Sequence, residues 1–207
     1  MEQGRKAATI PNYSKGVAIA MAIPKEVIRG IEQSPTNDYY DAYHSLNNQL
    51  DSLAEFCVDY LQEKGYHAYA QTVGKSVEFG IYTTAMPHKT VAVSGGLGWI
   101  GKSALLVTSR YGSAIRLTSV ITDAPLPIDE KIEVPKCGNC TICKDACPAG
   151  AITGNLWNAD SDRDWIFDAK ACRKKAREVA ATSIGKEITL CGKCIAVCPY
   201  TRKYVFE

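Results

Sequence analysis

The sequence contains no hydrophobic run long enough to cross a membrane. Its longest apolar stretch, Val17 to Ile23, is far shorter than the roughly 20 residues that a membrane-spanning helix requires. No positively charged leader precedes an apolar signal segment, and the chain has neither internal repeats nor low-complexity segments. We therefore expect a cytoplasmic globular protein that does not insert into a membrane, with one or two domains in its 207 residues.

Cysteine is concentrated at one end of the chain. Eight of the nine cysteines lie between residues 137 and 198, and seven of these form two groups that each end in Cys-Pro. The first group, residues 137–148, has the spacing C-x2-C-x2-C-x3-C-P of a bacterial ferredoxin ligand run. The second, residues 191–199, adds C-x2-C and C-x3-C-P, and Cys172 lies between the groups. Because soft thiolates suit iron, the spacing predicts two 4Fe–4S clusters.

The last cysteine of such a run binds the other cluster, so we predict a crossed assignment of the ligands. The ligands predicted for the cluster-one site are Cys137, Cys140, Cys143 and Cys198. Those predicted for the cluster-two site are Cys147, Cys172, Cys191 and Cys194.

Other uses of the cysteines fit the sequence less well. Disulfides form in an oxidising compartment, of which the sequence gives no sign. Structural zinc usually takes two C-x2-C pairs, and a C-x2-C-x2-C run followed by Cys-Pro departs from that pattern. Cys57 lies on the apolar stripe of a predicted helix, so we interpret it as a buried small hydrophobe rather than a ninth ligand.

The net charge of +2 is small but unevenly placed. Residues 1–167 carry 15 basic and 18 acidic side chains, whereas residues 168–207 carry 9 basic and 4 acidic ones. The basic segment includes Lys170, Arg173, Lys174, Lys175 and Arg177. These cations either stabilise the anionic clusters nearby or form a docking patch for an acidic electron donor or for RNA phosphates.

The pattern before the cysteine groups predicts an α+β core. Residues 16–23 form a continuous apolar run, which favours a buried central strand. Residues 25–32 predict a short helix, and residues 34–37 supply the cap of a long helix over residues 38–64. Further strands are predicted at residues 66–72, 77–83, 104–109 and 114–122.

Turn residues divide the later part of the core. The segment 110–113 predicts a hairpin between the strands at 104–109 and 114–122. Residues 123–128 read as a linker, so we predict one domain over residues 1–128 and a second over residues 129–207.

A glycine-rich stretch, residues 96–103, matches the phosphate-loop pattern G-x4-G-K-S. That pattern requires a helix after the lysine, whose N-terminus meets the phosphates. Residues 104–109 instead have the composition of a strand. Nucleotide binding is therefore the weaker interpretation of this stretch.

The same stretch carries a resemblance to epoxyqueuosine reductases and, more distantly, to corrinoid-dependent reductive dehalogenases. It comprises residues 96–107, 111–113 and 122–126, followed by the two cysteine groups, and it extends from about Gly16 to Tyr200. The resemblance implies an α+β core like those of nitroreductases and cobalamin-processing proteins. A ferredoxin-like module with two 4Fe–4S clusters would follow this core.

The resemblance also implies a cobalamin cofactor that the clusters reduce one electron at a time. The residues expected to bind it are Gly96, Gly98, Trp99, Gly101, Lys102 and Leu106. Glycines would let the backbone approach a large flat ligand, Trp99 would offer an aromatic wall, and Lys102 would meet a polar side group.

The resemblance assigns a proton donor to Tyr82. Counting back from Gly98 places Tyr82 where epoxyqueuosine reductases have an aspartate, and reductive dehalogenases use a tyrosine. A phenol with a pKa near 10 needs a nearby cation to donate well, and Lys89 or Lys102 could supply one. The alternative is that Tyr82 is simply an apolar wall residue.

The predicted function is a corrinoid-dependent, iron–sulfur oxidoreductase that works anaerobically. Its electrons would come from a low-potential donor such as ferredoxin or flavodoxin. The helical repeats that grip tRNA in the resembling family are not recognised in this sequence, so we expect a small-molecule substrate rather than tRNA. The alternative is a ferredoxin-like electron-transfer protein without substrate chemistry of its own.

Overall fold

A small antiparallel sheet forms the centre of the N-terminal half. The structure, a computed structural model, describes residues 13–73, 86–130, 132, 134–158, 160 and 162–207. The strands of the sheet are β1 (Lys15–Ala22), β2 (Ala68–Ala70) and β5 (Ile115–Thr122), in the order β1-β5-β2. β5 pairs with β1 along its full length, from Ile115 opposite Ala22 to Thr122 opposite Lys15.

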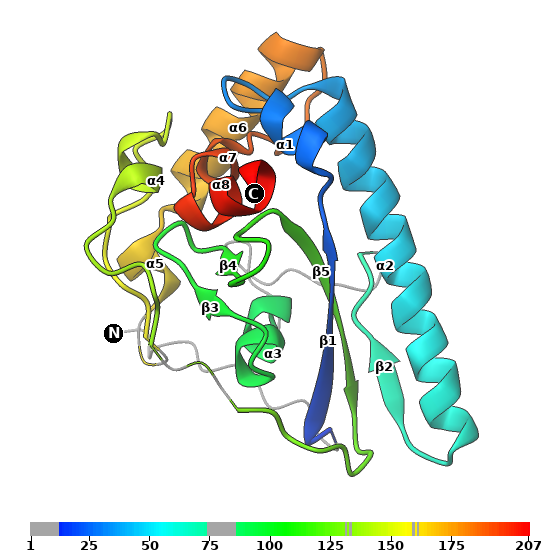
Figure 1. Cartoon of the computed structure of the whole chain (residues 1–207). Coiled ribbons are helices and arrows are strands. Elements are labelled where there is room, and N and C mark those ends of the chain that lie inside the picture. Colours follow the sequence, from blue (N-terminus) through cyan, green and yellow to red (C-terminus); the bar gives the residue numbers. More distant parts are fainter. Residues whose placement is uncertain (1–12, 74–85, 131, 133, 159, 161) are drawn as a thin grey trace.

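Helices cover both faces of this sheet (Figure 1). On one face, Val120 of β5 packs in a buried cluster with side chains of α2 (Asn37–Glu63). On the other face, Ile115 packs with side chains of α3 (His88–Ser94). Because alternate strand residues point to opposite faces, both helices draw on the same strand. Within the described residues β5 is central, so the prediction of a central β1 is wrong. β1 is apolar from Gly16 to Ala22, and side chains of α2 and α3 pack on its two faces.

The long helix agrees with the sequence prediction. Thr36 caps it, and its side-chain oxygen accepts a hydrogen bond of 3.2 Å from the backbone N–H of Tyr39. Its buried residues are Tyr39, Leu46, Asn47, Leu50, Ala54, Val58 and Leu61, and from Asn47 onward they recur every three or four positions. Cys57 packs, partly buried, against this side of the sheet. In the described part of the chain no helix is long and apolar enough to span a membrane.

The hairpin predicted between residues 104–109 and 114–122 is wrong. β4 (Leu106–Val107) pairs instead with β3 (Trp99–Ile100), in a separate two-stranded sheet. Only one bridge, between Thr108 and Gly112, closes the intervening turn. The ladder stops at Ala114, because its backbone N–H donates to the carbonyl of Tyr111 at 3.1 Å and its carbonyl accepts from the N–H of Ile23 at 2.9 Å. The backbone N–H of Ser113 donates to the Thr201 hydroxyl, 3.0 Å away in the C-terminal helix. The strand predicted at residues 77–83 lies outside the described residues.

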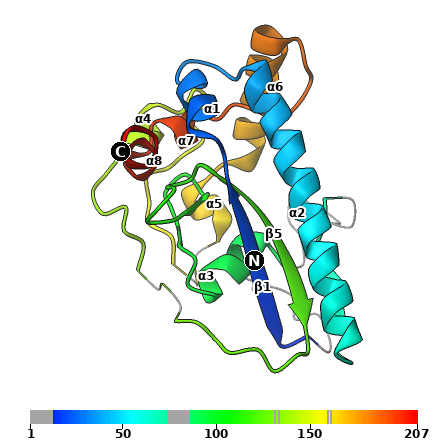
Figure 2. The same cartoon turned by 45° about the vertical axis from the view of Figure 1, so that its right-hand side comes forward.

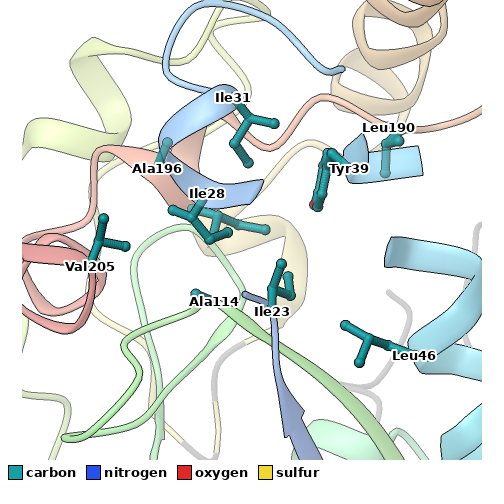
Figure 3. Close-up of a cluster of buried hydrophobic side chains, with 10 residues drawn as sticks. Ile23, Ile28, Ile31, Tyr39, Leu46, Ala114, Leu190, Ala196 and Val205 are labelled. Atoms are coloured by element: carbon teal, nitrogen blue, oxygen red, sulfur yellow. The ribbon is translucent and has the colours of Figure 1, made fainter. Parts of the chain in front are cut away.

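The C-terminal third consists of short helices that pack against the end of the sheet (Figure 2). These are α4 (Ile142–Asp145), α5 (Arg163–Ile166), α6 (Ala169–Ile184), α7 (Lys193–Ala196) and α8 (Pro199–Phe206). One further helix, α1 (Lys25–Gly30), belongs to the N-terminal part and precedes α2. Figure 3 shows a buried cluster to which both parts of the chain contribute. Ile23 and Ile28 from the first part meet Ala196 and Val205 from the second. The proposed boundary at residue 128 therefore separates two regions that share a core.

The contact between the Thr108–Gly112 turn and α8 provides a test of this shared core. Gly112 has a φ of +56°, and a Cβ atom there would overlap the backbone nitrogen of Thr201. Gly185 has a φ of +67° but open space around it, so Gly185→Ala is a matched control. Both variants should lose about 1–2 kcal/mol from the left-handed conformation. Gly112→Ala should lose about 1–3 kcal/mol more from the overlap, measured by urea unfolding. Equal losses would show that this contact does not stabilise the protein.

Candidate iron–sulfur centre

A cavity of about 190 Å³ lies between the C-terminal helices and the core. Its walls include all four cysteines of the predicted cluster-two site, Cys147, Cys172, Cys191 and Cys194. The core contributes Tyr39 and Tyr43 of α2 and Arg116 of β5 to the same cavity. Arg116 lies 4.3 Å from the centre of the Tyr43 ring, and its Nε donates to the Asn47 side chain at 3.0 Å. The cavity is therefore thiol-lined on one side and carries a fixed cation on the other.

The four cysteines of the predicted cluster-one site also lie near one another. Burial raises the pKa of Cys143 to about 11, and the neighbouring sulfurs of Cys137, Cys198 and Cys140 add to the rise. Cys198 is the residue before α8, far along the chain from the other three. The structure thus brings Cys198 to the first cysteine run, as the crossed pattern requires.

The donor chemistry at both sites fits iron–sulfur clusters. Burial raises the pKa of Cys172 to about 11, and the charges of Cys147 and Cys191 raise it further. Four thiolates held this close repel one another and are poorly solvated, so they need cationic metal to remain ionised. Among the described residues no three His, Cys, Asp or Glu side chains are placed to hold a single metal ion.

The two sites are neighbours. Burial raises the pKa of the Cys194 thiol, as do the cluster-two sulfurs of Cys191 and Cys172, and Cys143 of the cluster-one site contributes as well. A backbone N–H, that of Ala151, donates to the Cys147 sulfur at 3.4 Å. Such hydrogen bonds help to set the reduction potential of a bound cluster. Two adjacent clusters would supply one-electron transfer between them.

The glycine-rich stretch forms a tight turn between β3 and β4 rather than the start of a helix. The backbone N–H of Gly101 donates to the carbonyl oxygen of Leu105 at 2.8 Å, which closes the turn. No helix follows Lys102 in this fully described segment, so the dipole that a phosphate loop uses is missing. This agrees with the prediction that nucleotide binding is the weaker interpretation.

Close packing within the protein accounts for the three glycines predicted to approach a ligand. A Cβ atom on Gly96 would overlap the carbonyl oxygen of Glu130, and one on Gly98 would overlap that of Val107. One on Gly101 would lie 2.8 Å from a Val107 methyl group and 3.5 Å from the Cys137 sulfur. The turn therefore packs directly against the cluster-one site.

The other three residues predicted to bind cobalamin also face inward. Trp99 is 0% exposed, packs edge-on against Tyr200 at 4.9 Å, and has an indole N–H without a hydrogen-bond partner. The Lys102 ammonium group donates to the carbonyl oxygen of Cys140 at 3.0 Å, and Leu106 is buried in the core. The described residues of this turn thus do not form an open cradle for a corrin ring.

Of the remaining sequence candidates, Lys89 is placed and Tyr82 is not. The Lys89 ammonium group donates to the carbonyl of Ala104 at 2.5 Å, and burial together with the charge of Arg163 lowers its pKa to about 8. Ala104 is the one non-glycine residue with a positive φ, +58°, in the described chain. Lys89 therefore holds the turn between β3 and β4 in shape. Tyr82 lies outside the described residues.

A buried polar network around Ser119, in the middle of β5, was missed by the sequence analysis. His88 Nδ1 lies 2.8 Å from the Ser119 hydroxyl, which also accepts a hydrogen bond of 2.6 Å from the Gln71 amide. Ser119 is 0% exposed and Gln71 is 8% exposed. Burial lowers the pKa of His88, Arg116 lowers it further, and Asp51 opposes them. The signal available in the sequence was the pair of adjacent hydroxyl residues Thr118 and Ser119 in the middle of the strand predicted at residues 114–122.

Comparison with known proteins agrees with this geometry. Residues 136–201 match the family described as the 4Fe-4S double cluster binding domain. Epoxyqueuosine reductase of Bacillus subtilis is 31% identical over 93% of the chain and 49% of its own length. That of Aliivibrio fischeri is 29% identical over 78% of the chain and 40% of its length. The chain resembles epoxyqueuosine reductase. It spans about half the length of such relatives or less.

Solved structures show the same relationship. An epoxyqueuosine reductase bound to an epoxyqueuosine-modified tRNA stem loop is 27% identical, with a TM-score of 0.59 over 96% of the chain and 51% of the other protein. A catabolic reductive dehalogenase in complex with 3-bromo-4-hydroxybenzoic acid is 19% identical, with a TM-score of 0.72 over 90% of the chain and 25% of the other protein. The second likeness shows a common α+β fold.

The cysteine arrangement predicts an effect across sequence groups. Cys147→Ala should disturb the cluster bound by Cys191 and Cys194, although Cys147 belongs to the first run. Cys198→Ala should disturb the cluster of that first run. Iron analysis of anaerobically purified wild-type protein should give about eight atoms per chain, and each variant about four to eight. Electron paramagnetic resonance of the reduced variants should show which signal changes. Cys57→Ala is the control and should keep both signals. A change confined to the variant's own run would contradict the crossed assignment.

The buried network predicts a pH dependence of stability. Because the folded protein holds the His88 pKa below its usual value near 6.5, protonation favours unfolding. The stability contributed by neutral His88 is therefore present above pH 6.5 and lost as the pH falls. Between pH 7.5 and 6.0, wild-type protein should lose more unfolding free energy than His88→Gln, measured in urea with clusters bound. Equal losses would show that His88 titrates normally.

Proposed function

We propose that this chain is an iron–sulfur reductase in which two 4Fe–4S clusters carry electrons singly to an acceptor. The observation that carries the proposal is the cavity lined by Cys147, Cys172, Cys191 and Cys194 beside a second group of four cysteines. The likeness to epoxyqueuosine reductases supports reductase chemistry. A reducing, cytoplasmic compartment is part of the proposal, because free thiols persist there.

The residues around the two sites would bind, orient and shield the clusters. Residues 137–147, Cys172 and residues 191–198 supply the thiolates, and the backbone N–H of Ala151 donates to the Cys147 sulfur. Arg116 and Lys175 line the cluster-two cavity, where positive charge favours the more reduced, more negative state. Lys102 pins the ligand loop through the carbonyl of Cys140.

Cobalamin as the electron acceptor is the finer part of the proposal. The described glycine turn gives no support for cobalamin binding, because protein atoms fill the space around it. The support comes from the resemblance to epoxyqueuosine reductases and reductive dehalogenases. The substrate would be a small molecule, with Tyr82 as its proton donor. The support for a tRNA substrate is the similarity to an epoxyqueuosine reductase whose structure was solved with a tRNA stem loop.

The closed glycine turn favours a second candidate function. In the described chain, Trp99 and Leu106 are fully enclosed and Lys102 is bonded to the cysteine loop. A protein with this interior needs no corrinoid to explain its glycines. A ferredoxin-like electron carrier, without substrate chemistry of its own, is therefore the alternative.

Cobalamin titration separates the two functions. Protein purified anaerobically, with its iron content measured, is titrated with cob(II)alamin and the visible spectrum recorded. The proposal expects saturable binding near one equivalent and no binding of ATP with magnesium. Tyr82→Phe should bind cobalamin equally well but reduce a substrate more slowly, because it lacks the phenolic proton.

Each other outcome has a definite meaning. Iron-replete protein that binds neither ligand would favour the electron carrier and remove cobalamin from the proposal. ATP binding without cobalamin binding would restore the phosphate-loop interpretation. Protein that holds tightly bound zinc in place of iron would overturn the reductase proposal altogether.

A further inference from the structure

We infer that the outer face of α6 is the docking surface for an acidic one-electron carrier protein of the flavodoxin type. This inference rests on the proposed function, because it takes the cluster-two site to hold a redox cluster. Each encounter oxidises the carrier by one electron and reduces the cluster by one electron. No bond is made or broken.

The outer face of α6 is basic along its first two turns. Lys170, Arg173, Lys174 and Arg177 recur at the spacing i, i+3, i+4 and i+7. Residues at this spacing lie on one side of a helix. By the same spacing, Arg173 and Arg177 also adjoin the buried residues Ala176 and Ala180, and both arginines are only partly exposed. Lys170 and Lys174 are therefore the cations presented to solvent, with the two arginines at the margin of this face.

Two of these cations are available to a partner. Lys170 and Lys174 are exposed, and neither forms an ion pair in the described part of the chain. Arg177 is paired with Glu187 at 3.0 Å, and Lys175, which points toward the cavity, is paired with Glu178 at 2.8 Å. Exposed pairs of this kind stabilise the fold by little and are readily exchanged. The unpaired lysines are the strongest sites for an acidic surface.

The basic face lies directly above the cluster-two site. Cys172 is part of α6, and Lys175 of the same helix lines the cavity. Tyr39, which also lines the cavity, is 3% exposed and belongs to the shared core. A carrier that docks on α6 thus approaches the cluster from its solvent side, across one helix.

The charge distribution of the whole chain favours the same approach. Residues 1–167 carry more acidic than basic side chains, whereas residues 168–207 carry 9 basic and 4 acidic ones. Figure 2 shows α6 at the end of the molecule opposite the start of β1. An acidic partner is attracted to the end that carries α6, and such electrostatic steering raises association rates at low ionic strength. An acidic carrier matches this field, and a basic one does not.

Stopped-flow reduction of the cluster-loaded protein tests the inference. Reduced flavodoxin and dithionite are used in parallel, because dithionite needs no protein docking. For the Lys170→Glu/Lys174→Glu variant we expect the second-order rate constant with flavodoxin to fall at least tenfold at low salt. The difference should shrink at high ionic strength. The dithionite rate and the cluster reduction potentials should stay as in wild type, because both lysines are exposed.

A charge-matched control lies at the other end of the molecule. Lys15→Glu/Lys64→Glu makes the same change in net charge near the start of β1 and the end of α2. We expect its flavodoxin rate to fall less than threefold. A drop equal to that of the α6 variant would show a general charge effect and overturn the docking site.

The remaining outcomes distinguish failure of the docking site from failure of the proposed function. Equal flavodoxin rates for wild type and the α6 variant, with normal reduction by dithionite, overturn the docking site alone. Failure of dithionite to reduce the protein overturns the proposed function and the docking site with it. Binding of tRNA that is lost in the α6 variant, while its flavodoxin rate is unchanged, assigns this face to RNA instead.

Discussion

The position of Cys198 is the constraint on which much of the C-terminal third depends. Its sulfur lies with those of the first cysteine run, so the chain must return there after α6 and α7. This fixes the start of α8, from which Thr201 accepts a hydrogen bond from the Ser113 backbone and Tyr204 donates to the carbonyl of Ile23 at 3.0 Å. The ligand geometry and the shared hydrophobic core are therefore parts of one arrangement. Metal binding and folding should be strongly coupled in such a protein.

The features that sequence reasoning found were local. The spacing of the cysteines predicts how a short loop curls around a cluster. The cap residue and the apolar stripe of the long helix are likewise encoded within its own segment. The features that it missed were decided by partners distant in the chain. Strand β4 pairs with β3, while the backbone groups of Ala114 that a hairpin would need bond to Tyr111 and Ile23. β5 is central among the described strands because both β1 and β2 pair with it. Tyr82 and the strand predicted around it lie outside the described residues, so both stay predictions.

The polar network of His88, Ser119 and Gln71 illustrates the same limit. Each residue is unremarkable in its own segment, and only the fold brings β5, α3 and the end of β2 together. A buried serine that accepts from an amide can still donate to an unprotonated imidazole nitrogen. Both hydrogen bonds of the Ser119 hydroxyl are satisfied if His88 is neutral with its proton on Nε2, which agrees with the lowered pKa of His88. The network thus specifies a charge state that no local pattern encodes.

The glycine turn shows why one motif supports several interpretations. Glycine permits close approach without stating what approaches, and phosphate, a corrin ring and the protein's own backbone can each fill the space. In the described chain, Glu130 and Val107 fill it. The consequence is mechanical: the turn lies between the Cys137 sulfur on one side and, through Leu105, the cluster-two cavity on the other. Lys89 and Lys102 anchor it at both ends. A turn so placed keeps both clusters in register with the core, and that role holds for a corrinoid enzyme and for an electron carrier alike.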